Sequence, residues 1–168
     1  AEQYKDVVHE DAIKVAGATK APDYCFRIGG VRKSFLETKK PSVDIKSQIS
    51  PAYQLRRYAW SAKLPISILT DFEEIAIYGC RLRPKLSDKP SIERVRLYTY
   101  TQYPDLFEEI YNLLSKEAVL RGSFDKFAES EKQKRGTTEV DAEFLKEIEA
   151  WREALAKDIA IKNPRLSV

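Results

Sequence analysis

The chain has 168 residues, of which 43% are hydrophobic and 33% charged, and its formal net charge at pH 7 is +3. These values indicate a globular protein of one domain with a core of its own, and a net charge this small does not by itself indicate a nucleic-acid binder. No run approaches the roughly 18 apolar residues that a membrane-spanning helix needs, and no charged-then-apolar leader opens the chain. We therefore expect a cytoplasmic protein.

The charge is unevenly distributed along the chain. Residues 1–63 contain 12 Lys and Arg against 7 Asp and Glu, a net +5, whereas residues 104–168 contain 11 against 14, a net −3. Such a positive field in the first part suits the binding of a phosphodiester, although an uneven solvated surface explains it equally well. One histidine, His9, and two scattered cysteines, Cys25 and Cys80, exclude an ordinary four-ligand zinc site.

The first 21 residues predict little regular structure. A strand is expected within residues 11–16, followed by a loop at Gly17-Ala18-Thr19-Lys20. The start resembles mid-domain sequence, so we expect the chain to be a domain of a larger protein. Glu10 is the only acidic residue here that could serve a site further on, and a surface role is favoured for it.

Two strand-like runs, residues 22–28 and 31–39, meet at Gly29-Gly30 and predict a hairpin. In the second run the two-residue period of a strand places Phe35, Glu37 and Lys39 on one face. A carboxylate and an ammonium therefore lie side by side. Strands that serve only the core avoid burying such groups, so the hairpin is predicted to carry chemistry.

The register of this hairpin decides which groups meet. A two-residue loop at Gly29-Gly30 would place Asp23 opposite Leu36, whereas a three-residue loop from Gly29 to Val31 places Asp23 opposite Glu37. We predict the three-residue loop. Asp23 and Glu37 would then converge as oxygen ligands for Mg²⁺, which takes only one or two protein carboxylates and keeps several waters.

Pro22-Asp23 followed by Glu37-Thr38-Lys39 resembles the motif of the PD-(D/E)xK nucleases. A second acidic-x-Lys triplet, Asp44-Ile45-Lys46, lies in a polar loop and is interpreted as a chance match. Further segments are similar to the N-terminal endonuclease domain of type IIG restriction-modification enzymes and, more loosely, to type I restriction nuclease subunits: Lys39-Lys40-Pro41, Gln54-Leu55-Arg56-Arg57-Tyr58 and Leu69-Thr70-Asp71-Phe72-Glu73-Glu74. The resemblance covers most of the chain, from about Tyr4 to Asn163-Pro164.

Ser50-Pro51 predicts a helix start, with Ser50 as the cap and the helix running to about Lys63. Its expected buried stripe is Leu55, Ala59 and Ala62. An adjacent face carries polar side chains at helical spacing: Gln54, Arg57, Tyr58 and Ser61. The Gln-x-x-x-Tyr pattern resembles one found after the third strand of such nucleases, which implies that Gln54 faces the active site and that Tyr58 supports it or contacts DNA.

The rest of the nuclease part is predicted as alternating strands, loops and short helices. Residues 64–69 and 74–80 are expected strands, the first parallel to the Glu37 strand because a helix precedes it. The acidic residues of the turn between them, Asp71, Glu73 and Glu74, are expected to be solvated. Beyond them we predict a basic loop at 81–91, a strand at 92–100, a helix at 104–114 and a mixed segment at 120–135 that is mainly loop with a helical turn at 124–127.

Residues 141–162 form the most strongly periodic segment of the chain and predict a long helix. Asp141 is the expected cap, and Val140 against Leu145 the expected staple. One face is apolar: Phe144, Leu145, Ile148, Trp151, Leu155 and Ile159. We predict a nuclease domain at 1–135 and, at 136–168, a helix that packs on this domain or leads to a following one. The fold class is α/β (α+β): a restriction-endonuclease-like core with a mixed central sheet flanked by helices.

The resemblance implies a Mg²⁺-dependent DNA endonuclease domain, with Mn²⁺ as a substitute metal. Asp23, Glu37, Lys39 and Gln54 are the implied catalytic set, and the metal ligands are Asp23, Glu37 and the main-chain carbonyl of Thr38. The residues expected to bind DNA are Lys40, Arg57 and Tyr58. Implied partners are DNA, linked methyltransferase and target-recognition domains, and a second copy for double-strand cleavage.

Two alternatives belong to other functional classes. The first is a DNA-binding or interaction module of the same fold that does not cleave. The second is a regulatory or assembly domain that acts through its long acidic helix. The intact set of Asp23, Glu37, Lys39 and Gln54 argues against the first, and dimerisation without metal affinity would favour the second.

Overall fold

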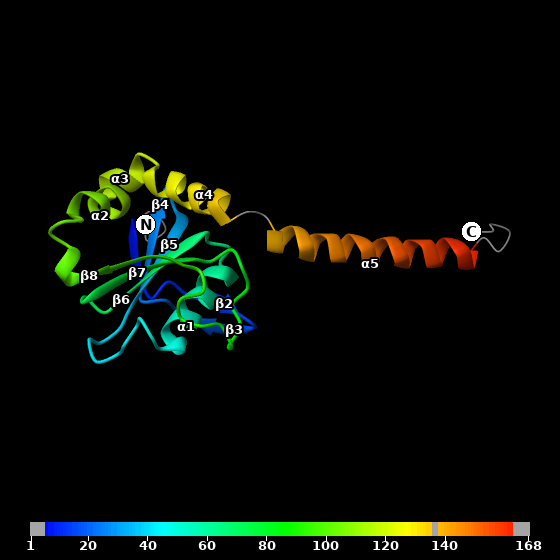
Figure 1. Cartoon of the computed structure of the whole chain (residues 1–168), viewed down its shortest axis with the longest axis horizontal. Helices are drawn as coiled ribbons and strands as arrows, with labels where there is room; N and C mark the ends of the chain where they lie inside the picture. The colour runs from blue at the N-terminus through cyan, green and yellow to red at the C-terminus, as the bar shows by residue number, and fades with distance from the viewer. Residues whose placement is uncertain (1–5, 136–137, 163–168) are drawn as a thin grey trace. The chain divides into compact units, whose positions relative to one another are not determined.

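A six-stranded mixed sheet forms the centre of the protein, in the order β1-β4-β5-β6-β7-β8 (Figure 1). The computed structural model describes residues 6–135 and 138–162, with the side chains of 6–131, 148–159 and 162. Only β5 and β6 pair in parallel, and the other pairs are antiparallel. The strands of this sheet are β1 (Val7–His9), β4 (Tyr24–Ile28), β5 (Val31–Thr38), β6 (Ile66–Thr70), β7 (Glu74–Gly79) and β8 (Arg94–Thr99).

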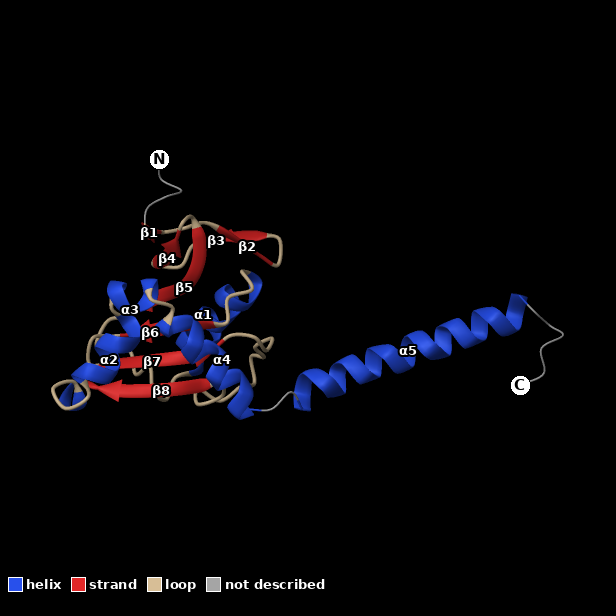
Figure 2. Cartoon of the chain, turned by 90° about the horizontal axis from the view of Figure 1, so that it is seen from above, coloured by secondary structure: helices blue, strands red, loops and turns tan. Residues whose placement is uncertain are grey.

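Helices cover both faces of the sheet (Figures 1 and 2). One face is covered by α1 (Ile49–Ser61) and a small second sheet of β2 (Ile13–Val15) and β3 (Ala18–Lys20). The other is covered by α2 (Phe107–Leu114), α3 (Lys116–Leu120) and α4 (Ser123–Arg135), with a 3-10 helix, η2 (Tyr100–Gln102), before them. The predicted restriction-endonuclease-like core, a mixed sheet flanked by helices, is confirmed.

The β4–β5 hairpin reaches its register by a different route from the one predicted. Ile28 pairs with Val31, so the loop is the two residues Gly29 and Gly30, and the predicted three-residue loop is wrong. Both glycines have positive φ, 56° and 83°, the combination that a tight two-residue hairpin turn requires.

A bulge then shifts the register by one residue. Arg27 pairs with Arg32 but Phe26 pairs with Ser34, so Lys33 is the extra residue of the bulge. Tyr24 consequently pairs with Leu36. Asp23 and Glu37 therefore occupy the next rung of the hairpin, which is the juxtaposition that the longer loop was expected to produce.

The α1 helix connects the parallel pair, as predicted. It begins at Ile49 after the cap residue Gln48, so Ser50 lies within its first turn and is not the cap. Leu55 and Ala59 are fully buried against the sheet, whereas Ala62 follows the helix and is only partly buried. Ala18–Lys20, predicted as loop, forms β3 because Gly17, with φ of 84°, turns the chain back on β2.

The mixed segment at 120–135 is helical, and its interpretation as mainly loop is wrong. Phe124 and Ala128, one helical turn apart on α4, are buried in a cluster with Ile77 and Tyr98 of the sheet. Asp125, Lys126 and Glu129 are exposed on the outer side of the helix. The apolar stripe of Phe124, Phe127 and Ala128 is only about one turn long, which is too short to show a helical period in the sequence.

The chain divides into two compact units, Ala1–Ala128 and Glu129–Val168. The second contains α5 (Thr138–Lys162), on which Ile148, Trp151 and Leu155 are exposed. Because α5 begins at Thr138, Asp141 lies inside the helix and is not its cap. The side chains of the predicted staple, Val140 and Leu145, lie outside the described residues, as does that of Phe144. None of the helices in the described ranges is long and apolar enough to cross a membrane.

Candidate active site

The candidate site lies where β5 ends, on the face of the sheet covered by α1. Phe35 and Glu37 point to this face, Phe35 into the core cluster that includes Leu55 of α1. The Glu37 side chain is only 3% exposed, and that of Lys39 20%. The backbone N–H of Lys39 donates to the carbonyl oxygen of Thr70 at 2.8 Å, which extends the β5–β6 pairing past the last strand residue. Lys39 is thereby held beside Glu37.

A short chain of polar contacts joins the strand to α1. Lys39 Nζ donates to Glu37 Oε1 at 2.8 Å and to Gln54 Oε1 at 3.3 Å. Gln54 Nε2 in turn donates to Glu37 Oε1 at 2.5 Å and lies 3.3 Å from Tyr58 Oη. The structure thus brings together three of the four predicted catalytic residues, with Tyr58 behind them.

The fourth predicted catalytic residue, Asp23, is held in place by Thr38, the residue between Glu37 and Lys39. Asp23 Oδ2 accepts hydrogen bonds from the backbone N–H of Thr38 at 2.6 Å and from Thr38 Oγ1 at 2.7 Å. The carbonyl oxygen of Asp23 also accepts from the N–H of Glu10 at 3.0 Å. The Glu10 side chain is exposed, in agreement with a surface role.

Glu37 is a buried carboxylate, and one of its two oxygens has no hydrogen-bond donor among the described residues. Burial raises its pKa, the Lys39 ammonium opposes this effect, and the charge of Asp23 adds to it. Oε1 is bonded to Lys39 and Gln54, but Oε2 is buried without a hydrogen-bond partner in the described part of the chain. A buried carboxylate oxygen without a donor is costly unless something else fills the position.

These residues fit a divalent cation with oxygen ligands. Glu37 Oε2 is the available atom, and Asp23 is the neighbouring carboxylate whose charge acts on Glu37. Within the described ranges His, Cys, Asp and Glu form no group of three or more that could hold a metal ion. A metal here would therefore have at most two side-chain carboxylates as ligands, which suits Mg²⁺ with several waters and not zinc.

The predicted DNA-binding residues lie around this site without contacts that define a role. Lys40 is exposed, and Arg57 is half-buried on α1. Tyr58 is also half-buried and packs against the core cluster that includes Leu55. Their binding of DNA, like the role of the Thr38 carbonyl as a ligand, stays a prediction.

Two neighbouring acidic groups have structural contacts. Asp71 was expected to be solvated, but it is 3% exposed and its Oδ1 accepts from the N–H of Glu74 at 2.7 Å, closing the β6–β7 turn. Asp44 is exposed and accepts from the N–H groups of Lys46 and Ser47, and the Ser47 N–H lowers its pKa. Asp44 thus stabilises a turn, which agrees with a chance match of the second triplet.

The Thr38 side chain is the site feature that the sequence did not indicate. Alternation places Thr38 on the face opposite Glu37, so its contact with Asp23 depends on where the β4 strand begins. The hydroxyl and the N–H both bond Oδ2 and fix the rotation of the Asp23 carboxylate. Thr38 therefore orients a predicted ligand through its side chain.

We expect Thr38→Val to weaken metal binding at this site by about tenfold, the usual effect of removing a hydrogen bond that orients a ligand. Thr38→Ser keeps the hydroxyl and should bind nearly as wild type. Calorimetric titration with Mn²⁺ measures both variants, with circular dichroism as a check of folding. Weaker binding by the Ser variant with wild-type binding by the Val variant would show that methyl packing, and not the hydroxyl, matters.

The chain is similar in sequence to part of a known restriction enzyme. No protein-family model and no solved structure matches the chain. Over 162 residues it is 44% identical to the type II restriction enzyme and methyltransferase RM.Eco57I of Escherichia coli. The match covers 95% of this chain but only 16% of that protein. The chain is therefore related to a segment, about a sixth in length, of a protein that combines restriction enzyme and methyltransferase.

Proposed function

We propose that the chain is the Mg²⁺-dependent DNA endonuclease domain of a type IIG-like restriction-modification enzyme, with a PD-(D/E)xK site made of Asp23, Glu37 and Lys39. The observation that carries the proposal is the unpartnered, buried Oε2 of Glu37 beside Asp23 and Lys39. A purely structural site would have no reason to bury a carboxylate oxygen without a donor. The similarity to a type II restriction enzyme supports the same reading.

Asp23 and Glu37, with the Thr38 carbonyl, would hold the metal. When bound, the metal supplies Lewis acidity at the phosphate and a water of lowered pKa; Mn²⁺ would serve in place of Mg²⁺. Lys39 lies beside Glu37 and would orient the attacking water and stabilise the negative charge that develops on the phosphate. Gln54 keeps Lys39 and Glu37 in place through its two contacts.

The substrate would be the phosphodiester backbone of DNA. Lys40, Arg57 and Tyr58 would contact that backbone beside the site. The parent protein would provide the methyltransferase and target-recognition domains, as the name of the relative suggests for that protein. Cleavage of both strands would bring two such sites together in a homodimer.

Nicking of supercoiled plasmid with Mg²⁺, Mn²⁺ or EDTA tests the proposal, at low salt and raised protein concentration. Wild type should nick only with metal, and Asp23→Ala should lower the rate at least about a hundredfold. The matched control is Asp44→Ala, which removes the acid of the second triplet and should nick as wild type.

If wild type does not nick, calorimetry with Mn²⁺ decides between nuclease and silent module. Binding by wild type that is lost in Asp23→Ala keeps the site. Equally poor binding by wild type and Asp23→Ala overturns the site and leaves the interaction module as the better reading.

A further inference from the structure

We propose that the loop of residues 81–91, here called the basic loop, forms with Trp60 a second contact surface for the DNA backbone, on the far side of α1 from the active site. The inference rests on the proposed function. The basic loop is part of the connection between β7 and β8 and contains four cations, Arg81, Arg83, Lys85 and Lys89, against one acid, Asp88; a second acid, Glu93, follows just before β8. All four cations are exposed.

The acid of the basic loop is occupied by a buried partner. Arg56 of α1 is 2% exposed, and its Nη1 donates to Asp88 Oδ2 at 2.8 Å. The N–H of Lys85 donates to the same oxygen at 3.0 Å. Within the described residues neither Lys85 nor Lys89 forms an ion pair. Their charges are therefore available to an external anion.

The basic loop is also anchored to the domain at two points. Tyr78 Oη donates to the carbonyl oxygen of Pro90 at 2.8 Å, which fixes one end to β7. Nearer the other end, the Arg83 guanidinium lies 5.5 Å from the centre of the Trp60 ring, a cation–π contact. A surface that is ordered before binding loses less conformational entropy when a ligand binds.

The position of this surface relative to the active site follows from α1. Gln54 and Tyr58, four residues apart, face Glu37, whereas Arg56 and Trp60, also four apart, face the basic loop. The helix between them is about 10 Å across, and duplex DNA has one phosphate per strand for about every 3.4 Å of its axis. The basic loop would thus contact phosphates roughly three base pairs from the cleaved bond.

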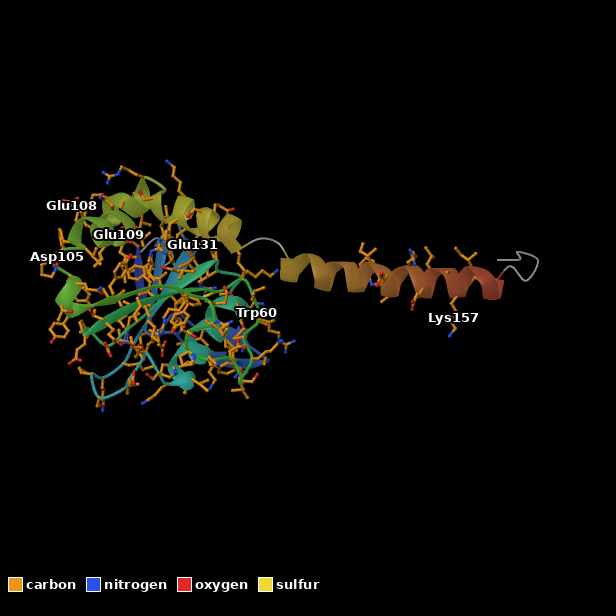
Figure 3. All side chains as sticks on the ribbon, in the orientation of Figure 1. Trp60, Asp105, Glu108, Glu109, Glu131 and Lys157 are labelled. Carbon is orange, nitrogen blue, oxygen red and sulfur yellow. The ribbon has the colours of Figure 1, made fainter. Side chains whose placement is uncertain are left out.

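Three acidic side chains of the domain lie away from the basic loop. Asp105, Glu108 and Glu109, before and within α2, are on the opposite side of the domain from Trp60 (Figure 3). A polyanion that approaches the basic loop therefore avoids their repulsion. Charge complementarity favours a nucleic-acid backbone over an acidic peptide, because regularly spaced phosphates match cations spread along a loop.

Trp60 provides a local reporter of this contact. It is 38% exposed, and the chain has one other tryptophan, Trp151 of α5, so Trp151→Phe leaves Trp60 as the single indole. The test titrates this variant with a short DNA duplex in EDTA, where cleavage cannot occur, and follows fluorescence and salt dependence. Lys85→Gln with Lys89→Gln keeps the Arg83–Trp60 and Arg56–Asp88 contacts. Arg121→Gln with Lys126→Gln is the control, two exposed cations on the α3–α4 side.

We expect duplex DNA to change Trp60 fluorescence. The Lys85/Lys89 variant should bind more than about tenfold more weakly at 0.1 M salt, with a salt slope shallower by about 1.8, the value for two lost phosphate contacts. The Arg121/Lys126 control should keep the wild-type slope. Three results would contradict the proposed surface. They are an unchanged salt slope in the Lys85/Lys89 variant, an equal loss of DNA binding in the control, and no DNA binding by wild type.

The outcomes separate this inference from the proposed function. If wild type nicks DNA with metal but the Lys85/Lys89 variant binds DNA normally, the proposal of a second DNA-contact surface is wrong and the nuclease proposal stands. Loss of binding in that variant, with equally poor Mn²⁺ binding by wild type and Asp23→Ala, supports the surface while the nuclease proposal fails.

Discussion

Glu37→Gln is expected to abolish both metal binding and metal-dependent nicking. The amide has the shape of the carboxylate, but it places a neutral group where Oε2 now lies buried without a partner. Metal affinity should fall below detection in a calorimetric titration with Mn²⁺. Nicking should fall by about a thousandfold, since a ligand and its charge are lost together.

The same change should leave the fold intact. In the metal-free protein Glu37 is a carboxylate whose pKa is raised by burial, so a neutral side chain removes an unfavourable desolvated charge. Against this, Lys39 loses its anionic partner, although its side chain is 20% exposed and reaches water. The two effects oppose each other, and the unfolding midpoint should stay within about 4 °C of wild type, the shift that ~1 kcal/mol produces.

Glu73→Gln is the matched control for this variant. Glu73 is exposed in the β6–β7 turn, three residues after Thr70, whose carbonyl accepts the Lys39 N–H. It is an acidic residue near the same end of the sheet, without the burial of Glu37. Metal binding and nicking equal to wild type are expected. If Glu73→Gln lost metal and Glu37→Gln did not, the metal site would belong to the turn.

The strand pattern predicted the contact between Glu37 and Lys39 correctly, but it did not predict the loop and the bulge of the hairpin. The two-residue period placed Glu37 and Lys39 on one face, and the structure has them in contact. The register of Asp23 was predicted through a longer loop, whereas the chain uses a tight Gly-Gly turn and a bulge at Lys33. Both routes place one extra residue between Ile28 and Glu37, in the loop or in the strand, and the alternation of apolar residues does not distinguish them.

Other features depend on packing that no local pattern reveals. The helix at 123–135 is not apparent from its sequence because its surroundings come from distant parts of the chain, and the burial of Asp71 is not apparent because it depends on the turn that Asp71 itself closes. Asp71 closes a turn in which its side chain is buried, and Phe124 packs on strands about 45 and 25 residues earlier, at Ile77 and Tyr98. Polar composition describes the outer side of such elements only. The Thr38 contact with Asp23 likewise needs the observed start of β4.

Lys39→Met is expected to separate metal binding from chemistry. Lys39 Nζ now bonds Glu37 Oε1 and Gln54 Oε1, and its charge would lie beside a bound cation. Removing a like charge from a metal site favours the metal, so Mn²⁺ affinity should be unchanged or higher. Nicking should nevertheless fall by about a hundred- to a thousandfold, because the cation that stabilises the developing phosphate charge is lost.

A catalytic lysine is distinguished from a structural one because its removal keeps or raises the metal affinity but lowers the nicking rate. If Lys39 only held Glu37 in place, its loss would weaken metal binding and nicking together, as Glu37→Gln does. Lys46→Met, from the second triplet, is the control because it makes the same change of size and charge. Its Mn²⁺ affinity and its nicking rate should match those of wild type. Calorimetry and plasmid nicking on the three variants therefore decide the role of Lys39. If Lys39→Met keeps the Mn²⁺ affinity and loses the nicking rate, Lys39 takes part in the reaction. If both fall in parallel, Lys39 has a structural role.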